Sequence, residues 1–498
     1  MTSTKRSSSK PQVLNATPTP IETMLKIVSC THLSRGADGQ TFARVPIQDR
    51  FEFYEVRSAA FRNWLVDAYF DQCKEPPSKL VISRVIAVLE ARAQFRGTIP
   101  PAHIRVASAS DVFYLDLADL EGRAVEIRSS GWKVVHQLGV HFRRPAGLLP
   151  LPLPVSGGTI NLLRPYVNLG ELDFRLFVAW LTAAIRPAGP YPPLVLYGEQ
   201  GSAKSTLARV ARLLVDPHCT PLLGEPASTR DLMVTALNNR VLAFDNLGNL
   251  PGWLSDCFCR LATGGGHAAR SLVTDNQVAY VQAERPIILN GIDEFVKRGD
   301  LIDRSVFLHL SPIHPADRRM EGELWSSFQF DYPRILGSVL DAVVLGMRIL
   351  PSVELPEVSR MADFAYWGEA VGRGLGWPEQ SFRSAYARNR RTATDSSIDD
   401  SAVAEALFRL VPSSLKWSGS TTELHRQLTA GVGKTIALSG RWPKHVSRFS
   451  GEVRRLAPQL RERGLAITFS RSRDQRLITL AYDNDWLFRR PHRDHRGS

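Results

Sequence analysis

The segment from Pro193 to Thr206 constrains the fold of this chain more than any other. It reads as a short apolar strand, PLVLY, followed by the turn GEQGSAK and the start of a helix. Gly198 and Gly201 allow a tight backbone path that a side chain would obstruct. Successive N–H groups in such a turn form a nest for phosphate oxygens. We therefore expect ATP to bind along this loop, through Gly198, Glu199, Gln200, Gly201, Ser202, Ala203, Lys204, Ser205 and Thr206.

Two side chains of the loop carry the expected chemistry. Lys204 supplies a positive charge for the β- and γ-phosphates, and Ser205 supplies a hydroxyl ligand for Mg²⁺. The loop departs from the pattern G-x-x-x-x-G-K-[ST] at Ala203, where the second glycine would stand. Because alanine is the smallest replacement, we expect the loop still to close on phosphate. The alternative, an unrelated glycine turn before a helix, does not explain why strand, turn, Lys-Ser pair and helix agree.

A second apolar strand, 240–245, ends in a carboxylate that suits the metal. Asp245 is expected to hold Mg²⁺, usually through water. Many ATPases of this kind place an acid next, to activate the attacking water, but here that residue is Asn246. An amide orients water and cannot accept its proton. The sequence therefore predicts slow hydrolysis or another carboxylate in that role, either Asp256 or Glu225.

A third apolar strand ends at Asn290, which is placed to sense the γ-phosphate or to align water. Fourteen residues further on, Arg304 precedes another strand and is a candidate arginine finger for a neighbouring subunit. The alternative for Arg304 is a surface ion pair with Asp300 or Asp303. The expected catalytic residues are thus Lys204, Asp245, Asn246, Asn290 and Arg304.

The segment 261–282 contains three glycines followed by His267 and Arg270, and predicts a hairpin with polar tips. The order of loop, acidic strand, glycine hairpin, Asn-ended strand and arginine resembles superfamily 3 helicases of the AAA+ class, particularly the poxvirus-type primase-helicases of phages and mobile elements. The resemblance covers residues 190–312. It implies an AAA+ ATPase that forms a homo-oligomeric ring, such as a hexamer, with single-stranded DNA in its pore. It makes His267 and Arg270 candidates for gripping that strand. Ala203 and Asn246 depart from the family's pattern.

The C-terminal part is expected to bind duplex DNA. The chain has a net charge of +13, and basic residues are concentrated between 441 and 476. Apolar residues at helical spacing within 446–460 predict a helix, and the strands around 466–480 predict a basic hairpin. This order resembles a winged helix, in which a helix enters the major groove and the wing contacts phosphate. The DNA-binding candidates are Arg448, Arg454 and Arg455 on the helix and Arg471, Arg473 and Arg476 on the wing. The alternatives are a solvated basic helix and a unit that docks protein.

The expected fold class is α/β, with an AAA+-like phosphate-loop ATPase core, an α+β N-terminal domain, a helical segment and a C-terminal winged helix. The expected divisions are a leader at 1–20, the N-terminal domain at 21–150, the ATPase at 151–315, the helical segment at 316–400, the winged helix at 401–485 and a basic tail at 486–498. A Pro/Gly-rich stretch at 148–158 suggests the second boundary. Asp116 and Asp119 are expected to be structural rather than paired metal ligands.

The sequence contains no run of about 18 uncharged apolar residues, so we expect no membrane span. The five cysteines include no C-x-x-C pair, which suggests reduced thiols in the cytoplasm. Three functions compete. The first is an ATP-driven, helicase-like DNA motor for replication of a mobile element. The second is a DNA-binding regulator or defence ATPase that ATP switches, with little or no hydrolysis. The third is an interaction protein whose ATP site is only structural.

Overall fold

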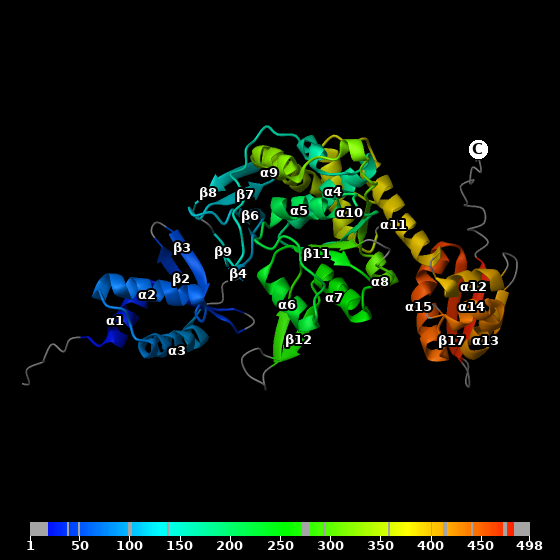
Figure 1. The fold of residues 1–498 in the computed structure, drawn as a ribbon, viewed down its shortest axis with the longest axis horizontal. Helices are drawn as coiled ribbons and strands as arrows, with labels where there is room; N and C mark the ends of the chain where they lie inside the picture. The colour runs from blue at the N-terminus through cyan, green and yellow to red at the C-terminus, as the bar shows by residue number, and fades with distance from the viewer. Residues whose placement is uncertain are drawn as a thin grey trace, which may run out of the picture.

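A computed structural model gives the fold of the chain (Figure 1). It describes residues 18–36, 39–47, 50–97, 102–136, 139–270, 278–291, 295–356, 359–399, 401–411, 416–439, 442–471 and 476–482. Three bodies follow one another along the longest axis. The first is coloured blue, the large central body runs from cyan to yellow, and the C-terminal body is orange to red.

The central body is built on a four-stranded parallel sheet. Its strands are β10 (Leu194–Tyr197), β11 (Leu242–Leu247), β14 (Ile287–Gly291) and β15 (Val306–His309), in the order β11-β14-β10-β15. These strands are almost entirely buried, because both faces of a parallel sheet are covered by other elements. The surrounding helices are α4 (Glu171–Ala184), α5 (Lys204–Val215), α6 (Thr229–Asn238), α7 (Gly252–Thr263) and the short α8 (Gly299–Ile302). The predicted α/β class is confirmed.

A four-stranded antiparallel meander belongs to this same body. Its strands are β5 (Val106–Ala109), β6 (Val112–Asp116), β7 (Ala124–Arg128) and β8 (Gly131–Val135). Their apolar side chains share one continuous core with those of α4, α5 and the long helix α9 (Glu321–Ile349). The expected division at residue 150 therefore does not separate two cores. The Pro/Gly-rich stretch 148–158 crosses the surface of this core, where Leu151 is buried and the Val155 N–H donates to the Pro333 carbonyl (2.9 Å).

The first body has a smaller core of its own. It contains α1 (Pro20–Ile27), the 3₁₀ turn η1 (Val28–Cys30), β1 (His32–Arg35), β2 (Thr41–Ile47), β3 (Arg50–Glu55), α2 (Ala59–Cys73) and α3 (Lys79–Arg96). The three strands form an antiparallel sheet in chain order. A short parallel pair, β4 (Ala102–His103) with β9 (His141–Phe142), follows it. The α+β character predicted for the N-terminal region thus holds for residues 20–96.

The helical segment packs against the parallel sheet and leads to the C-terminal body. It comprises α9, α10 (Ala362–Gly374) and α11 (Ser381–Asp399), and α10 and α11 both pack on α4. Within the described residues, only Glu321–Ser352 is long and apolar enough to cross a membrane, and 56% of its apolar window is buried inside the protein. That is how the core helix of a soluble protein behaves, so this helix is weak evidence for a membrane span. The segment shares the core of the central body.

The C-terminal body has a separate core around Trp442, Phe449 and Leu460. Its helices are α12 (Ala402–Leu410), α13 (Thr421–Gly431), α14 (Gly433–Leu438) and α15 (Val446–Glu462). Its strands β16 (Lys416–Ser420), β17 (Leu465–Arg471) and β18 (Arg476–Tyr482) form an antiparallel sheet in the order β16-β18-β17. The predicted helix and the predicted hairpin are both present as α15 and β17–β18. That this unit is a winged helix remains a prediction.

Candidate nucleotide site

Three of the predicted polar positions meet at one edge of the parallel sheet. The loop 198–203 follows β10, Asp245 lies in the last part of β11, and Asn290 lies in the last part of β14. Because the strands are parallel and β14 lies between β11 and β10, all three reach the same edge. Open α/β sheets bind ligands at the carboxyl ends of their strands. The geometry therefore places the predicted loop where this architecture binds its ligands.

The loop takes the path that its glycines permit, and Ala203 takes a glycine's conformation. Gly198 has φ of 149°, and a Cβ there would lie 2.3 Å from the Leu310 carbonyl oxygen. Gly201 has φ of 83°. Ala203 has φ of 66° and ψ of 28°, in the left-handed region, immediately before the first residue of α5. The loop thus keeps the backbone shape that a second glycine would adopt without strain.

Lys204 is held against the loop by its ammonium group. Its Nζ donates to the carbonyl oxygens of Gly198 (2.6 Å) and Glu199 (2.8 Å). Burial lowers the pKa of this ammonium from its ordinary value, and the nearby Asp245 carboxylate opposes that shift. An ammonium has three donors, and two of them fix the side chain over the loop. The charge is therefore positioned at the start of α5, where the backbone N–H groups of a helix also attract anions.

Ser205, Asp245 and Asn290 contact one another. The Ser205 hydroxyl donates to Asp245 Oδ1 (3.2 Å), and Asn290 Nδ2 donates to the Ser205 Oγ (3.2 Å) and to Asp245 Oδ1. Asn290 is only 2% exposed, and its Oδ1 has no hydrogen-bond partner among the described residues. Hydroxyl and carboxylate oxygens are the ligands that Mg²⁺ prefers, and it usually keeps several waters as well. This donor set fits such an ion, and the buried Asn290 oxygen is an acceptor available to water.

Asn246 lies in a β-bulge of β11, and its side chain is exposed. The register between β11 and β14 shifts between Phe244 and Leu247. Asn246 has φ of 56°, is exposed, and its N–H donates to Asp245 Oδ1 (2.9 Å). Asparagine is one of the few residues that adopt left-handed geometry readily. The bulge explains locally why asparagine suits this position.

The structure separates the two alternative carboxylates that the sequence left open. Leu223 pairs in parallel with Phe244, and the Asp245 N–H donates to the Leu223 carbonyl (2.9 Å). This segment thus lies beside β11 at Leu223, and the exposed Glu225 follows two residues later. Asp256 instead belongs to α7 and forms an ion pair with Arg298 (2.7 Å). Of the two, Glu225 is the one that closely follows a residue paired with β11.

Two arginines lie on the segments that flank β15. Arg304 precedes the strand, and its Nη1 donates to the Asp300 carbonyl (2.7 Å). In the described contacts, the Asp300 and Asp303 carboxylates pair with other arginines, namely Arg298, Arg360 and Arg390. Arg318 follows the strand, and its Nη2 lies 3.6 Å from where a Cβ on Gly201 would stand. Sequence reasoning missed Arg318, because its only signal is a short basic run after a strand.

The predicted DNA-binding residues lie on the β12–β13 hairpin and in the C-terminal body. His267 and Arg270 lie in β12 (Gly266–Arg270), which forms the expected hairpin with β13 (Val278–Gln282). The placement of their side chains lies outside what the structure describes, as does that of Arg476, and Arg473 lies outside the described residues altogether. Arg471, at the end of β17, is exposed.

The three arginines of α15 do not share one surface. Arg448 and Arg455 line a cavity between α15 and the central body. Arg454 instead stacks over the Phe469 ring, 4.4 Å from its centroid. These three side chains therefore do not form a single helix face that could enter a DNA groove.

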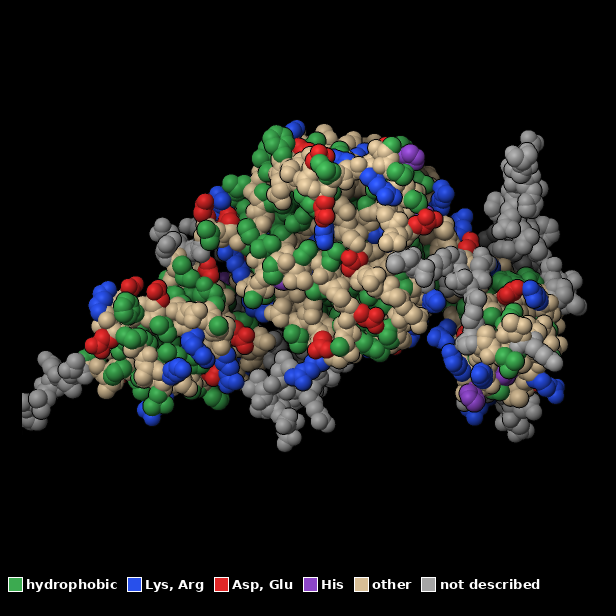
Figure 2. Space-filling model, in the orientation of Figure 1, with side chains coloured by type: hydrophobic (Ala, Val, Ile, Leu, Met, Phe, Trp, Pro, Cys, Tyr) green, Lys and Arg blue, Asp and Glu red, His purple; other side chains and the backbone are tan. Residues whose placement is uncertain are grey.

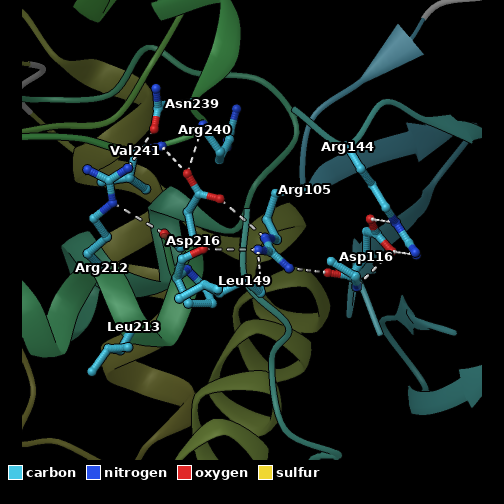
Figure 3. Close-up of polar contacts among 12 residues, drawn as sticks. Arg105, Asp116, Arg144, Leu149, Arg212, Leu213, Asp216, Asn239, Arg240 and Val241 are labelled. Atoms are coloured by element: carbon cyan, nitrogen blue, oxygen red, sulfur yellow. Dashed lines mark hydrogen bonds and ion pairs between the residues drawn. The ribbon is translucent and has the colours of Figure 1, made fainter. Parts of the chain in front are cut away.

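A buried polar network joins the far end of α5 to the antiparallel meander (Figure 3). Arg105 is fully buried, and its Nε donates to Asp216 Oδ1 (3.2 Å), directly after α5. Arg105 also donates to the carbonyl of Asp116 (2.9 Å), whose carboxylate binds Arg144 (2.7 Å). The other Asp216 oxygen accepts from the Arg240 N–H (2.9 Å), just before β11. Asp116 is therefore structural, as predicted, and the network ties together the elements behind the site.

Comparison with protein families identifies two successive matches. Residues 160–383 match a model described as actinomycete integrative conjugative element replication protein. Residues 403–492 match the C-terminal domain model of the same replication protein. Together they cover more than half of the chain. A search among curated proteins found no significant match.

Comparison with solved structures shows a likeness over nearly the whole chain. A structure titled "SCCmec type IV Cch - active helicase" aligns with a TM-score of 0.50 and 11% identity, covering 91% of this chain and 93% of that one. The C-terminal region of NrS-1 in its A-form apo structure aligns over 93% of this chain and all of that one, with 8% identity and a TM-score of 0.41. At such identities the first likeness concerns the fold alone.

Proposed function

Because this chain is a replication protein of a mobile element, related to those of actinomycete integrative conjugative elements, we propose that it is an ATP-dependent, helicase-like motor acting on DNA. The main support for this proposal is that four polar side chains lie together at the carboxyl ends of the parallel strands. They are Lys204, Ser205, Asp245 and Asn290. These side chains come from three separate strands or strand ends, and no local turn would bring them together by itself.

In this proposal the loop 198–206 holds the phosphates of ATP. Lys204 contacts the β- and γ-phosphates, and Arg318 adds a second cation beside Gly201. Ser205 and Asp245 hold Mg²⁺, directly or through water, and the ion neutralises charge on the phosphates. Asn290 orients water through its buried amide oxygen. The chain's own groups thus supply positioning and electrostatic stabilisation, which are the main contributions to phosphoryl transfer.

Water activation falls to Glu225 in this account. Asn246 cannot accept a proton, and Asp256 is neutralised by Arg298. Glu225 is exposed, closely follows a residue paired with β11, and has a carboxylate that can accept the proton of an attacking water. A carboxylate that reaches the site from a neighbouring segment, rather than from the strand of Asp245, would still permit turnover.

The remaining parts of the proposal concern assembly and DNA. Arg304 acts on the nucleotide of a neighbouring subunit, which requires a homo-oligomeric ring such as a hexamer. His267 and Arg270 on the β12–β13 hairpin grip single-stranded DNA in the pore. The C-terminal body binds DNA through its basic surface, and the protein works in the cytoplasm, where its DNA is found.

A second candidate is an ATP-switched DNA-binding regulator or defence ATPase with little or no hydrolysis. Asn246 favours it, because no acid directly follows Asp245. In that case ATP would be held by the same residues and Glu225 would be dispensable. The interaction protein with a structural ATP site is less favoured, because Ser205, Asp245 and Asn290 form a polar cluster suited to a metal ion.

The test of the nucleotide site is Lys204→Ala in the full chain. Loss of a charged hydrogen-bond donor costs about 1.5–3 kcal/mol, so we expect MgATP affinity to fall about tenfold or more. Lys26→Ala removes an exposed lysine of α1, in the first body, and serves as the matched control. Unchanged MgATP affinity in a folded Lys204→Ala protein would rule out the proposed site.

A further inference from the structure

A large cavity lies between the central body and the C-terminal body. Its volume is about 1270 Å³. Its walls come from the start of α4, from β10 and β15, from α8 and α11, and from α15. Gln459 of α15 reaches α8, where its side chain lies 2.7 Å from where a Cβ on Gly299 would stand. The cavity therefore belongs to neither body alone.

One face of α15 forms the C-terminal wall. Arg448, Glu452, Arg455 and Gln459 line the cavity, at spacings of four, three and four residues. Such spacings place residues on one side of a helix. The adjacent face of α15, with Phe449, Val453 and Leu460, is buried in the core of the C-terminal body. The polar face of this helix is thus directed at the central body.

Cations outnumber acids among the lining residues. Lys297, Arg388, Arg448 and Arg455 are all exposed, and they come from both bodies. Figure 2 shows Lys and Arg side chains gathered along the side of the C-terminal body that faces the central body. Of the lining acids, Glu171 is paired with Arg164 and Arg175.

The two other lining acids are partly buried. Burial raises the pKa of the Asp173 and Glu452 carboxyls above their ordinary values. Because cations outnumber acids along its walls, the lining favours an anionic ligand.

We propose that this cavity is a channel for the phosphate backbone of one nucleic-acid strand, held between Arg388 of the central body and Arg448 and Arg455 of α15. Arginine binds phosphate oxygens well, and exposed cations along a groove are the usual means of tracking a backbone. A strand in this cavity would contact both bodies at once. The basic helix thus acts together with the central body and not as a separate reader of duplex DNA.

The size of the cavity favours a single strand over a duplex. A duplex accommodates a whole α-helix inside its major groove, so a turn of duplex exceeds a cavity of this volume many times over. A few nucleotides of one strand are of the same order as 1270 Å³. The floor also offers aromatic surface, because Tyr197 and Phe307 stack in parallel with ring centroids 5.6 Å apart.

The cavity also touches the strand that carries the nucleotide loop. Tyr197 lines it and is followed directly by Gly198. A strand held there would therefore contact the residue next to the phosphate-binding loop. The inference rests on the proposed DNA partner and not on ATP turnover.

The test uses full-length protein and fluorescence anisotropy with an oligo-dT strand and a duplex of equal length, over a range of salt concentrations. Arg388→Ala and Arg455→Ala should each weaken strand binding several-fold at fixed salt. Each should also reduce the salt slope by about 0.7, the value for one phosphate contact on a single strand. Arg388→Lys should restore most of the slope, because it keeps the charge.

Arg426→Ala is the matched control, because Arg426 is an exposed arginine of α13 in the same body, carries the same charge and lies outside the cavity. It should change strand affinity less than twofold. Equal losses for Arg426→Ala and Arg455→Ala, no loss for Arg388→Ala, or losses confined to the duplex would each overturn the channel. A wild-type protein that binds neither probe would overturn the proposed DNA partner as well.

Discussion

At the scale of single residues, Ala203 stands out because its backbone is strained. A non-glycine residue in the left-handed region costs roughly 1–2 kcal/mol, and Ala203 adopts φ of 66°. The loop that it closes continues directly into α5 and holds the Lys204 ammonium. The strain therefore sits at the position that most directly shapes the proposed phosphate site, as strain often does at functional sites.

Ala203→Gly should stabilise the protein by about 0.5–1 kcal/mol, because relief of the strain exceeds the entropy cost of a glycine. MgATP affinity should stay equal or rise. Urea unfolding followed by tryptophan fluorescence measures the first and a nucleotide titration the second. Gly201→Ala, at φ of 83°, is the matched opposite change and should destabilise. A less stable Ala203→Gly protein would contradict this account of the loop.

Glu225→Gln should lower ATP turnover about 100-fold or more, because a positioned general base contributes roughly that factor, while MgATP binding stays intact. Asn246→Asp should raise turnover, since it places a second proton acceptor directly after Asp245 without changing side-chain size. Asp256→Asn is the control and should have little effect. Steady-state phosphate release measures all three. Full turnover in Glu225→Gln would assign water activation to another group.

The polar residues of the site were accessible from the sequence to different degrees. Lys204, Ser205, Asp245 and Asn290 could be predicted, because each lies near or after the carboxyl end of an apolar strand and parallel strands bring these ends together. The sequence did not favour Glu225 over Asp256, and it gave no reason to single out Arg318. The segments that carry these two residues have no local pattern, and only tertiary packing determines where they lie. The left-handed backbone conformation of Ala203 could not be predicted either, because the identity of a residue does not determine its φ angle.

At the scale of secondary-structure elements, the buried network behind the site connects α5 with the antiparallel meander. Arg105 and Asp216 are both fully buried. Each also makes further hydrogen bonds, Arg105 to carbonyls and Asp216 to backbone N–H groups before β11. Removing one partner of such a pair leaves an uncompensated buried charge. The network therefore fixes the far end of the helix that begins at the nucleotide loop.

Asp216→Ala should destabilise the protein by about 3–5 kcal/mol, because it leaves the buried Arg105 charge without its carboxylate partner. Glu121→Ala removes a partner of Arg123 at the surface and should cost less than about 1 kcal/mol. Urea unfolding measures both. Asp216→Ala with Arg105→Met should recover part of the loss, since the unpaired charge is gone. Similar small effects for both single changes would show that the network contributes little.

The same elements show where sequence reasoning about domains fails. A run of Pro and Gly at 148–158 is typical of a linker. In this structure it lies over a shared core, and Leu151 packs into that core. The meander before the run and the sheet after it therefore belong to one body. No sequence pattern states which sheet or helix the strands of the meander pack against.

At the scale of the whole molecule, the cavity between α15 and the central body and the proposed nucleotide site share the strand β10. Tyr197 faces the cavity, and the next residue begins the phosphate-binding loop. We propose that the protein uses ATP in a way that depends on DNA, which requires both sites and both bodies in one chain.

The most direct test is ATP turnover by the full-length protein with and without single-stranded DNA. We expect turnover to rise several-fold with oligo-dT, to be absent in Lys204→Ala and to be absent in Arg304→Ala. Mixing those two variants should restore part of the activity, because each then supplies what its neighbour lacks. Turnover that is unchanged by DNA and insensitive to Lys204→Ala would contradict the claim that this chain is an ATP-dependent DNA motor.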